Sequence, residues 1–401
     1  MALGMNASAA LVGAAWAAVL LWLVGAALTW RGIGRQQTLA PAASDRDALT
    51  GDDAPLVSIL VPARNEERRV LEQAVRSMLS QDYGNFEVVA VNDRSTDATG
   101  TILRLIARQD ARLRVVEGVE PRGGWLGKPY ALQQAFEVSR GVWVLATDAD
   151  MIFEGTAVRS AVGHALAGRY DALTLLPRVD CLTFWERVFM PSFGWFMLMV
   201  LPLERINDPR RREALGVGGF FLIRRAALER VGGYGAVRGE VTEDLRMAEI
   251  LKGAGFHLRA EYAPDLARTR MQTNFHEIWE GFTKNLFAGA KFSLWQAAVG
   301  SLGVLLVSVA PPVLALWSAL MLASGAGGIW SKLLLPTCFV WLLQIVIFDL
   351  INRLWEIPRV YAATVPLGHA LFVAILLNSA IRIATGRGVT WKGRTLYKRG
   401  K

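Results

Sequence analysis

The sequence contains few of the residues that build redox centres or transition-metal sites. Its 401 residues include only two cysteines, Cys181 and Cys338, and four histidines. The cysteines have no metal-ligand spacing and form no disulfide framework, which suits a reducing, cytoplasm-facing domain. The histidines are scattered along the chain, and none of them is assigned a role as a ligand.

Charge is absent from the start of the chain. Residues 1–30 contain no charged side chain, and Arg31 follows directly. A membrane-spanning helix needs about 20 apolar residues, which this segment supplies. A cleaved signal peptide, the alternative, would have a basic beginning and a shorter apolar core. We therefore predict an N-terminal transmembrane anchor at 1–30, followed by a linker at 31–55.

A second region poor in charge, 296–381, is predicted to be a C-terminal transmembrane region. Its apolar segments lie near 297–324, 331–350 and 360–380. Pro311-Pro312 should kink the first segment. Arginines after residue 30 and the basic tail, 382–401, both predict a cytoplasmic location. Three spans would place the tail outside, so one segment is re-entrant, or the segment with two prolines is a hairpin, or the charge rule fails.

The net charge of +9 raises the question of an acidic partner. Binding to nucleic acid would need basic residues interleaved with aromatic residues on one domain. Here the basic excess lies partly beside the apolar segments, where anionic lipid headgroups explain it better. The expected partner is therefore a membrane, and no nucleic acid is expected. The sequence leaves the oligomeric state open.

Between the apolar regions the pattern alternates between short apolar runs and segments with helical spacing. The expected strands are 57–61, 86–91, 113–118 and 142–147, and the expected helices are 67–81, 96–110 and 128–140. This alternation predicts parallel βαβ units, and therefore an α/β fold with helices on both faces of the sheet. Ligands of such sheets bind at the carboxyl ends of the strands.

Polar motifs stand at three of these strand ends. PARNEE (62–67) follows the first strand, Asn92-Asp93 ends the second, and Asp148 and Asp150 end the fourth. Two carboxylates that converge at a strand end repel each other, and a cation offsets that repulsion. The pattern predicts a nucleotide and a metal at this edge of the sheet.

Five motifs in order resemble the family 2 glycosyltransferases of the GT-A fold. They are VSILVPARNEE, VVAVNDRSTDAT, the pair Asp148 and Asp150, GVGGF at 216–220, and VTEDLRMAEILKGAG at 241–255. The resemblance covers 56–265, which is predicted to be the GT-A domain. With the terminal spans, the layout is similar to the membrane-bound ceramide, hopanoid-pathway and carotenoid-acid glycosyltransferases.

The resemblance implies a binding site for a UDP-sugar. Asp93 resembles the carboxylate that reads the uracil ring, and Pro62, Arg64 and Glu66 would line the same pocket. Lys128 resembles a lysine near the donor phosphates. The alternatives are ordinary: Asp93 can belong to a turn and helix cap, and Lys128 can be a solvated lysine at a helix start.

The same resemblance implies a metal site and a general base. Asp150 resembles the metal ligand of the family's DxD motif, with Asp148 nearer the ribose or the metal, and Mg²⁺ or Mn²⁺ suits carboxylate and diphosphate oxygens. Asp244, rather than Glu243, matches the general base of an inverting single displacement. The alternatives are a strand-to-turn Asp pair, and acidic residues that complement a helix dipole, with Thr242 as the cap.

Glycines and an apolar segment complete the prediction. Gly218 and Gly219, with Gly216, would let the backbone approach donor and acceptor, or would only shape a tight strand entry. The segment 188–203, broken by prolines, is read as in-plane at the membrane interface, with a buried core helix as the alternative. An interfacial helix region is also predicted at 266–295.

One family pattern is missing. Processive polysaccharide synthases carry Q-x-x-R-W after the base, whereas this chain reads MQTNFHEIW, without an Arg-Trp pair. We therefore predict a multi-pass inner-membrane enzyme that transfers one sugar from a UDP-sugar to a lipid acceptor. The alternatives are a processive synthase and a catalytically silent module that binds a sugar nucleotide or lipid.

Overall fold

The structure, a computed structural model, describes residues 2–42, 54–391 and 394–397. Part of the predicted linker and part of the basic tail therefore lie outside the described residues. The chain divides into two compact units. The sheet unit comprises Gln36–Asp180 and Leu201–Met271, and the helical unit comprises Met1–Arg35, Cys181–Val200 and Gln272–Lys401.

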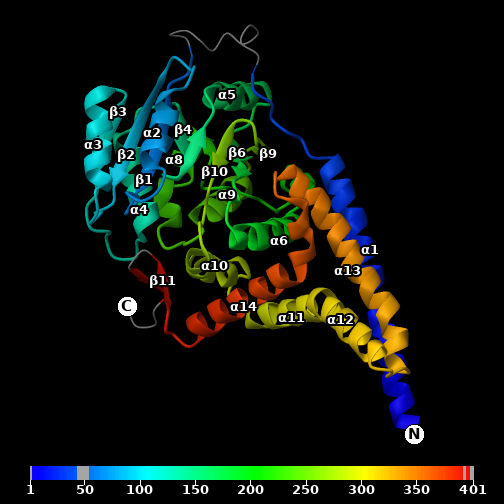
Figure 1. The fold of residues 1–401 in the computed structure, drawn as a ribbon. Helices are drawn as coiled ribbons and strands as arrows, with labels where there is room; N and C mark the ends of the chain where they lie inside the picture. Colours follow the sequence, from blue (N-terminus) through cyan, green and yellow to red (C-terminus); the bar gives the residue numbers. More distant parts are fainter. Residues whose placement is uncertain (1, 43–53, 392–393, 398–401) are drawn as a thin grey trace. The chain divides into compact units, whose positions relative to one another are not determined.

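The sheet unit is built on a seven-stranded sheet in the order β3-β2-β1-β4-β8-β6-β9 (Figure 1). Its strands are β1 (Val57–Ala63), β2 (Phe86–Asn92), β3 (Leu113–Glu117), β4 (Trp143–Ala146), β6 (Ala172–Leu176), β8 (Phe221–Arg224) and β9 (Leu258–Tyr262). β1 to β4 are parallel, and β8 runs antiparallel to β4 and β6. The predicted α/β alternation is therefore confirmed.

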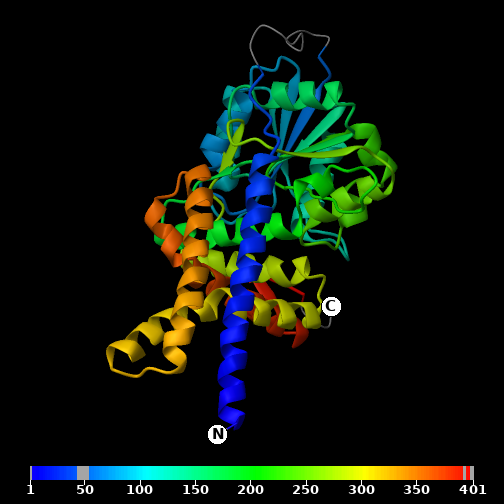
Figure 2. The same cartoon turned by 90° about the vertical axis from the view of Figure 1, so that its right-hand side faces the viewer.

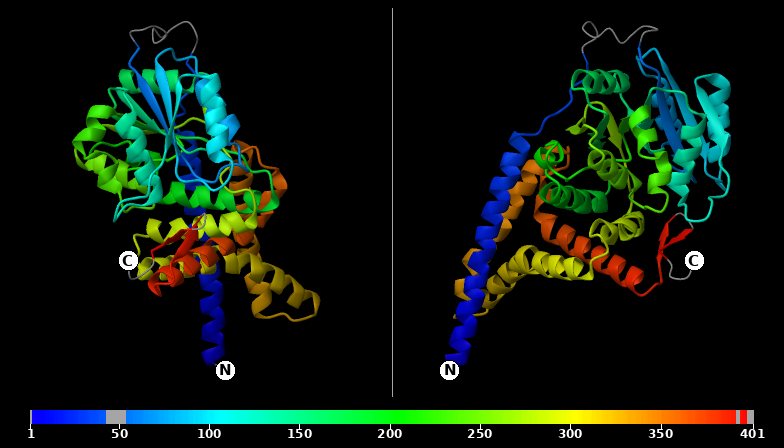
Figure 3. Two further views of the ribbon diagram at one scale, coloured as in Figure 1. Left: turned by 90° about the vertical axis from the view of Figure 1, so that its left-hand side faces the viewer. Right: turned by 180° about the vertical axis from the view of Figure 1, so that it is seen from behind.

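Helices cover both faces of this sheet (Figure 3). They are α2 (Leu71–Leu79), α3 (Thr99–Gln109), α4 (Gly127–Val138), α5 (Ala157–Ala167), α7 (Leu203–Ile206), α8 (Arg225–Arg230) and α9 (Glu243–Gly253). α2, α3 and α5 pack in one apolar core, and α4, α8 and α9 pack in the other. Within β1, Ile59 faces the first core and Leu60 the second, because successive strand side chains point to opposite faces.

The strand order brings the polar motifs together. β1 lies between β2 and β4 and is parallel to both, so the three strands end at the same edge of the sheet. The chain continues from β4 into β5 (Met151–Phe153). β5 belongs to a smaller sheet, which also contains β10 (Ala267–Thr269) and β7 (Arg178–Val179). In the predicted linker, Leu39 N donates a hydrogen bond to the Tyr262 carbonyl of β9 at 2.8 Å.

Among its described residues, the helical unit contains four helical segments that are long and apolar enough to cross a membrane. They are Ala7–Gly34, Leu294–Ala323, Ile329–Leu354 and Arg359–Ala384. The unit's elements are α1 (Ala2–Gly34), α6 (Phe184–Val200), α10 (Phe275–Gly289), α11 (Leu294–Val304), α12 (Ala310–Ala323), α13 (Ile329–Leu354), α14 (Val365–Ala384), and the hairpin β11 (Val389–Trp391) with β12 (Arg394–Leu396). The predicted N- and C-terminal transmembrane helices are thus confirmed as helices.

Two of these helices run side by side in the same direction. α1 and α13 share a buried cluster that includes Val19, Trp22, Val340 and Phe348, and Figures 1 and 2 show both helices running from the same lower end. α14 instead crosses their direction, and it bonds to α10, where Asn378 Nδ2 donates to Thr283 Oγ1 at 3.0 Å. Of the predicted C-terminal segments, α14 therefore differs from α13 in direction.

The predicted kink at Pro311-Pro312 is present as a turn of π-helix, Leu305–Val309, between α11 and α12. Proline has no N–H, so the two prolines leave the carbonyls four residues earlier without their usual partners. Trp22 Nε1 of α1 donates to the Val307 carbonyl, and Gln344 Nε2 of α13 donates to the Ser308 carbonyl, each at 2.9 Å. Side chains from two other helices thus satisfy both freed acceptors.

This arrangement predicts the effect of Gln344→Met. The substitution keeps a long, unbranched side chain but leaves the buried Ser308 carbonyl unpaired. We expect it to cost about 0.6–2 kcal/mol. Thermal unfolding in detergent measures this cost, with Leu343→Met on the same helix as the control. Equal melting temperatures for the two variants would contradict the assignment.

The segment predicted to lie in the membrane interface is mainly α6. Pro191 is inside this helix, Val188 and Met190 are buried, and the ring of Phe189 packs on Phe282 of α10. α6 runs across α1 and α13, and Phe196 contacts Phe372 of α14 (Figure 2). The segment is therefore helical and packed on other helices of its unit, and an interfacial position remains a prediction.

Candidate active site at the carboxyl ends of the strands

The loops after β1 and β2 are joined by hydrogen bonds. Arg64 Nη1 donates to the Asp93 carbonyl at 2.8 Å, and Asn65 N donates to Ser95 Oγ at 3.1 Å. Glu66 N donates to Thr99 Oγ1 at 2.8 Å, which holds the β1 loop against the start of α3. These bonds make the two loops one rigid wall of the site.

Three of the four residues predicted to bind the nucleoside, Arg64, Glu66 and Asp93, lie in this wall, and Pro62 directly precedes it. Pro62 is in β1, in register with Val91 of β2. The Asp93 side chain is buried and forms an ion pair with Arg94, with Oδ1 and Nε 3.3 Å apart. Arg64 and Glu66 occupy the adjacent loop. The arrangement brings the predicted residues together without testing the role of each.

The Asp148-Asp150 pair occupies the turn between β4 and β5. Thr147 Oγ1 donates to the Gly219 carbonyl at 2.7 Å, which ties the end of β4 to the glycine-rich loop. Ala149 is buried, whereas Asp148 is 40% exposed and Asp150 17% exposed. The two carboxylates therefore flank a buried residue at the sheet edge.

Lys128 is the centre of a charged cluster. Its Nζ lies 2.7 Å from Asp148 Oδ1 and 2.6 Å from Glu243 Oε1. Lys128 lies in the first turn of α4, and Glu243 begins α9, so the ammonium joins two helix starts to the end of β4. The Lys128 side chain is 36% exposed, so it is partly solvated as well as paired with two carboxylates.

Electrostatics in the cluster favour the charged lysine. Burial by itself lowers the pKa of Lys128, but attraction to Asp148, Glu243 and Asp244 outweighs it and leaves this pKa well above its ordinary value. Burial raises the pKa of Glu243, and the Lys128 charge opposes that rise only in part. The cluster therefore carries a fixed positive charge among carboxylates at the proposed diphosphate position.

Asp244 is held by the glycine-rich loop. Gly218 N donates to Asp244 Oδ2 at 2.7 Å, and Leu245 N donates to Asp244 Oδ1 at 2.8 Å. Thr242 occupies the cap position of α9, but its side chain makes no capping hydrogen bond, so the expected capping role is wrong. The carboxylate of Asp244 takes the N–H of Leu245 in the first turn instead.

Positions 218 and 216 favour glycine, because other atoms of the site lie close to where a Cβ would be. A Cβ on Gly218 would lie 2.8 Å from Lys128 Nζ, 3.1 Å from Asp244 Oδ2 and 3.4 Å from Asp148 Oδ2. A Cβ on Gly216 would lie 2.2 Å from the Asp244 carbonyl oxygen. Gly219 faces away from this cluster, since its Cβ would meet Met151 Sδ at 2.7 Å.

These distances predict that alanine substitutions of the glycines differ in their effects on turnover and stability. Gly218→Ala should keep the fold, because the Lys128 side chain is flexible, yet it displaces the ammonium and should lower turnover about tenfold. Gly216→Ala should destabilise the unit as well, because the clash is with backbone. Gly253→Ala is the control, since a Cβ there meets nothing within 4 Å. Turnover and melting temperature of the three variants check the order.

Arg69 is a site residue that the sequence prediction missed. Its Nη1 lies 3.5 Å from Asp150 Oδ2, and its Nη2 donates to the carbonyls of Arg270 and Met271, at 3.3 Å for Arg270. The available signal was the last arginine in PARNEERR, next to the nucleotide motif. Glu243 was considered only as an alternative base, and its contact with Lys128 was not foreseen.

The residues fit a divalent cation that shares its ligands with a bound diphosphate. The described residues contain no group of three or more His, Cys, Asp or Glu side chains arranged to hold a metal alone. Mg²⁺ commonly uses one or two carboxylates and takes its other ligands from phosphates and water. Asp148 and Asp150 supply such a carboxylate pair.

Comparison with known proteins agrees with this geometry. Residues 58–232 match the model of the family described as Glycosyl transferase family 2. This stretch contains the two nucleotide-wall loops, the Asp148-Asp150 pair and the glycine-rich loop. The chain carries a glycosyltransferase family 2 domain. The resemblance inferred from the motifs is confirmed.

Two curated relatives of the family 2 domain are bacterial enzymes. The chain is 29% identical over 241 residues to the beta-monoglucosyldiacylglycerol synthase of Synechocystis sp., which covers 57% of this chain and 47% of that protein. It is 25% identical over 238 residues to the 4,4'-diaponeurosporenoate glycosyltransferase of Staphylococcus aureus, covering 58% and 61%. The chain thus spans about half the length of the curated relatives it matches.

A solved structure supports the GT-A fold. The mannosyltransferase PcManGT of Pyrobaculum calidifontis, in complex with GDP-Man and Mn²⁺, superposes with a TM-score of 0.53 at 21% identity. The similarity covers 87% of this chain and 98% of that one. The family 2 domain of this chain therefore has a GT-A fold.

Proposed function

We propose that the chain transfers one hexose from a UDP-sugar to a hydroxyl group of a membrane lipid, with inversion at the anomeric carbon. The observation that carries the proposal is the convergence of Asp148, Lys128, Glu243 and Asp244 around Gly218. A cation among carboxylates suits a diphosphate leaving group, and a held carboxylate beside it suits a general base.

The proposed chemistry is a single displacement. The acceptor hydroxyl gives its proton to a carboxylate oxygen of Asp244 while its oxygen bonds to the anomeric carbon of the sugar. The bond from that carbon to the diphosphate oxygen breaks, and the electron pair leaves with UDP. Lys128 stabilises the charge that develops on the diphosphate, and Gly218 N orients Asp244.

Asp148 and Asp150 would hold a Mg²⁺ or Mn²⁺ in this proposal. When bound, the cation supplies charge stabilisation of the leaving diphosphate. Before the donor binds, Lys128 and Arg69 already offset the two carboxylates. The nucleoside would rest on the wall made by the loops after β1 and β2, with Asp93 facing the uracil.

A lipid acceptor is favoured by two independent observations. Both curated relatives named above take their names from lipids, a glucosyldiacylglycerol and a carotenoid acid. The helical unit supplies four apolar segments of membrane-spanning length. The missing Arg-Trp pair after Gln272 favours a single transfer over a processive synthase.

Turnover assays test the proposal. Purified protein with Mn²⁺, a panel of UDP-sugars and a bacterial lipid extract should release UDP and yield one glycolipid, identified by mass spectrometry. Mono-, di- and oligosaccharides serve as water-soluble acceptors in parallel. Efficient transfer to them would contradict the lipid acceptor. Tight UDP-sugar binding without any turnover would favour the silent binding module.

We also propose that the arginine-rich ends of α1 and α13 face the cytoplasm of a bacterial inner membrane. Arg31 and Arg35 follow α1's apolar run. Arg353 lies in the last turn of α13, which runs parallel to α1, and Arg359 begins the 3₁₀ turn that follows α13. Because α14 crosses these helices, we place it in the interface. The basic tail would then be cytoplasmic, as its charge predicts.

Cysteine labelling checks this orientation. In a background with Cys181→Ser and Cys338→Ser, Ser324→Cys between α12 and α13 should react with a membrane-impermeant maleimide in whole cells. Glu356→Cys at the other end of α13, and a cysteine appended after the tail, should react only after lysis. Labelling of the tail in whole cells would instead make α14 a full span.

A further inference from the structure

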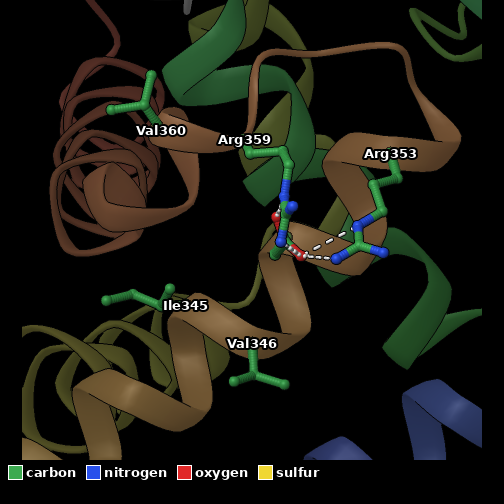
Figure 4. A pocket seen from close by; sticks show the side chains of 6 residues that line it. Ile345, Val346, Arg353, Arg359 and Val360 are labelled. Carbon is green, nitrogen blue, oxygen red and sulfur yellow. Dashed lines mark hydrogen bonds and ion pairs between the residues drawn. The ribbon is translucent and has the colours of Figure 1, made fainter.

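A hollow of about 670 Å³ lies at the arginine-rich end of α13, within the helical unit. It is lined by Ile345, Val346, Asp349, Arg353, Arg359 and Val360 (Figure 4). The proposed glycosyl transfer uses none of these residues. The proposed glycosyl transfer therefore assigns no function to this hollow.

The polar half of the hollow is a pair of guanidinium groups held by one carboxylate. Asp349 Oδ2 accepts from Arg353 Nη2 at 2.6 Å, and Asp349 Oδ1 accepts from Arg359 Nε at 2.6 Å. Asp349 is 17% exposed, whereas Arg353 is 57% exposed and Arg359 69% exposed. The carboxylate is thus covered, and the positive groups are presented outward with one charge in excess over it.

The apolar half continues along the surface of α13. Leu335, Phe339, Leu342 and Val346 follow one another at helical spacing, and they are exposed by 66%, 38%, 54% and 59%. Ile345 lies roughly 12 Å from Arg353 along the axis, from the rise of an α-helix. The exposed stripe from Leu335 to Val346 adds roughly 16 Å, which is long enough for a fatty acyl chain.

We propose that this hollow binds an anionic phospholipid, with its phosphate on Arg353 and Arg359 and one acyl chain along the stripe from Val346 to Leu335. Both arginines bond to Asp349 through Nε and Nη2, which leaves the Nη1 end of each guanidinium to donate to a phosphate. Charge complementarity favours this occupant, because hydrogen bonds from a guanidinium to a phosphate are charge-assisted. Basic pockets at the cytoplasmic ends of membrane helices bind such headgroups. Glu356 is the other acidic residue of this helix end, and Arg31 and Arg35 end the neighbouring α1.

The lipid would join α13 to the segment that follows it. Arg353 belongs to α13, whereas Arg359 and Val360 begin the 3₁₀ turn Arg359–Thr364 that leads into α14. A ligand that contacts both sides binds the folded unit and not the unfolded one, so it raises the melting temperature. The inference stands apart from the glycosyl transfer, and its test needs no turnover.

Three ligands distinguish the contribution of the phosphate headgroup to binding from that of the acyl chains. Full-length protein in detergent is titrated with dioctanoyl phosphatidic acid, with dioctanoylglycerol, which lacks the phosphate, and with glycerol 3-phosphate, which lacks the chains. We expect the phosphatidic acid to bind at least tenfold more tightly than either of the others and to raise the melting temperature. Equal binding of glycerol 3-phosphate would identify a free-phosphate site and overturn the proposal.

Two double variants test whether the arginines of the hollow bind the phosphatidic acid. Arg353→Gln/Arg359→Gln should weaken phosphatidic acid binding roughly 30-fold, from the usual contribution of two arginines at an anionic lipid surface. Lys291→Gln/Lys332→Gln removes the same charge from exposed positions of the helical unit away from the hollow, and it should stay within about twofold of wild type. Equal losses in both double variants would overturn the assignment.

A further variant tests the acyl-chain site without removing the contacts between the arginines and Asp349. Val346→Asp leaves the arginines and Asp349 in place and changes an exposed residue, so the fold should persist. It puts a carboxylate below the headgroup and should weaken phosphatidic acid binding about tenfold. Unchanged binding in this variant would exclude an acyl chain on the stripe.

Discussion

Replacing Asp244 with asparagine is expected to lower glycosyl transfer by about 10²-fold or more, the scale of general-base catalysis, with UDP affinity close to wild type. Asparagine has the size of aspartate, and its one carbonyl oxygen can keep one of the two hydrogen bonds that Asp244 accepts from Gly218 N and Leu245 N. It cannot take the proton of the acceptor hydroxyl. UDP release at saturating donor and acceptor measures the loss, and calorimetric titration measures UDP affinity.

Asp208→Asn provides the matched control, because Asp208 pairs with Arg210 on the surface of the same unit. It should leave turnover unchanged. Glu243→Gln is the informative companion, since it weakens the hold on Lys128 and should act first on donor affinity. Full turnover in Asp244→Asn together with the hundredfold loss in Glu243→Gln would transfer the base role to Glu243.

Replacing Asp150 with alanine should abolish the metal-dependent part of UDP-sugar binding. The diphosphate then lacks the cation that Asp150 would hold with Asp148, and like charges at the sheet edge are left without that compensation. Titrations of UDP with Mn²⁺ and with EDTA should give the same affinity for this variant. Wild-type protein should bind more tightly with Mn²⁺.

Asp110→Ala is the control for this effect. Asp110 pairs with Arg112 before β3, at the end of the sheet away from the site. Its metal response should match that of wild type. A metal response retained in Asp150→Ala would mean that Asp148 or another group holds the cation, and the assignment of Asp150 would be wrong.

The sequence predicted the first half of the sheet well. Four apolar runs became β1 to β4, because parallel strands buried on both faces need nearly continuous apolar residues. The order of strands was not predictable, since β8 enters between β4 and β6 in the antiparallel direction. No local pattern in residues 221–224 encodes that neighbour.

The site was predictable as motifs and not as contacts. Asp148, Lys128 and Asp244 were recognised separately from their sequence surroundings. Their meeting at Gly218 depends on how α4 and α9 pack on one face of the sheet. Arg69 escaped notice for the same reason, because its partners, Arg270 and Met271, are about 200 positions away in the chain.

The way the chain alternates between its two units limits how it can be divided. Residues 181–200, which include α6, belong to the helical unit but interrupt the sequence of the sheet unit. A soluble fragment cut at Gln36 and Met271 would therefore still carry α6, without α10 and α14. The aromatic ring of Phe189 would lose its contact with Phe282 of α10. Preparing the sheet unit alone requires a loop in place of α6, and not merely removal of the two ends.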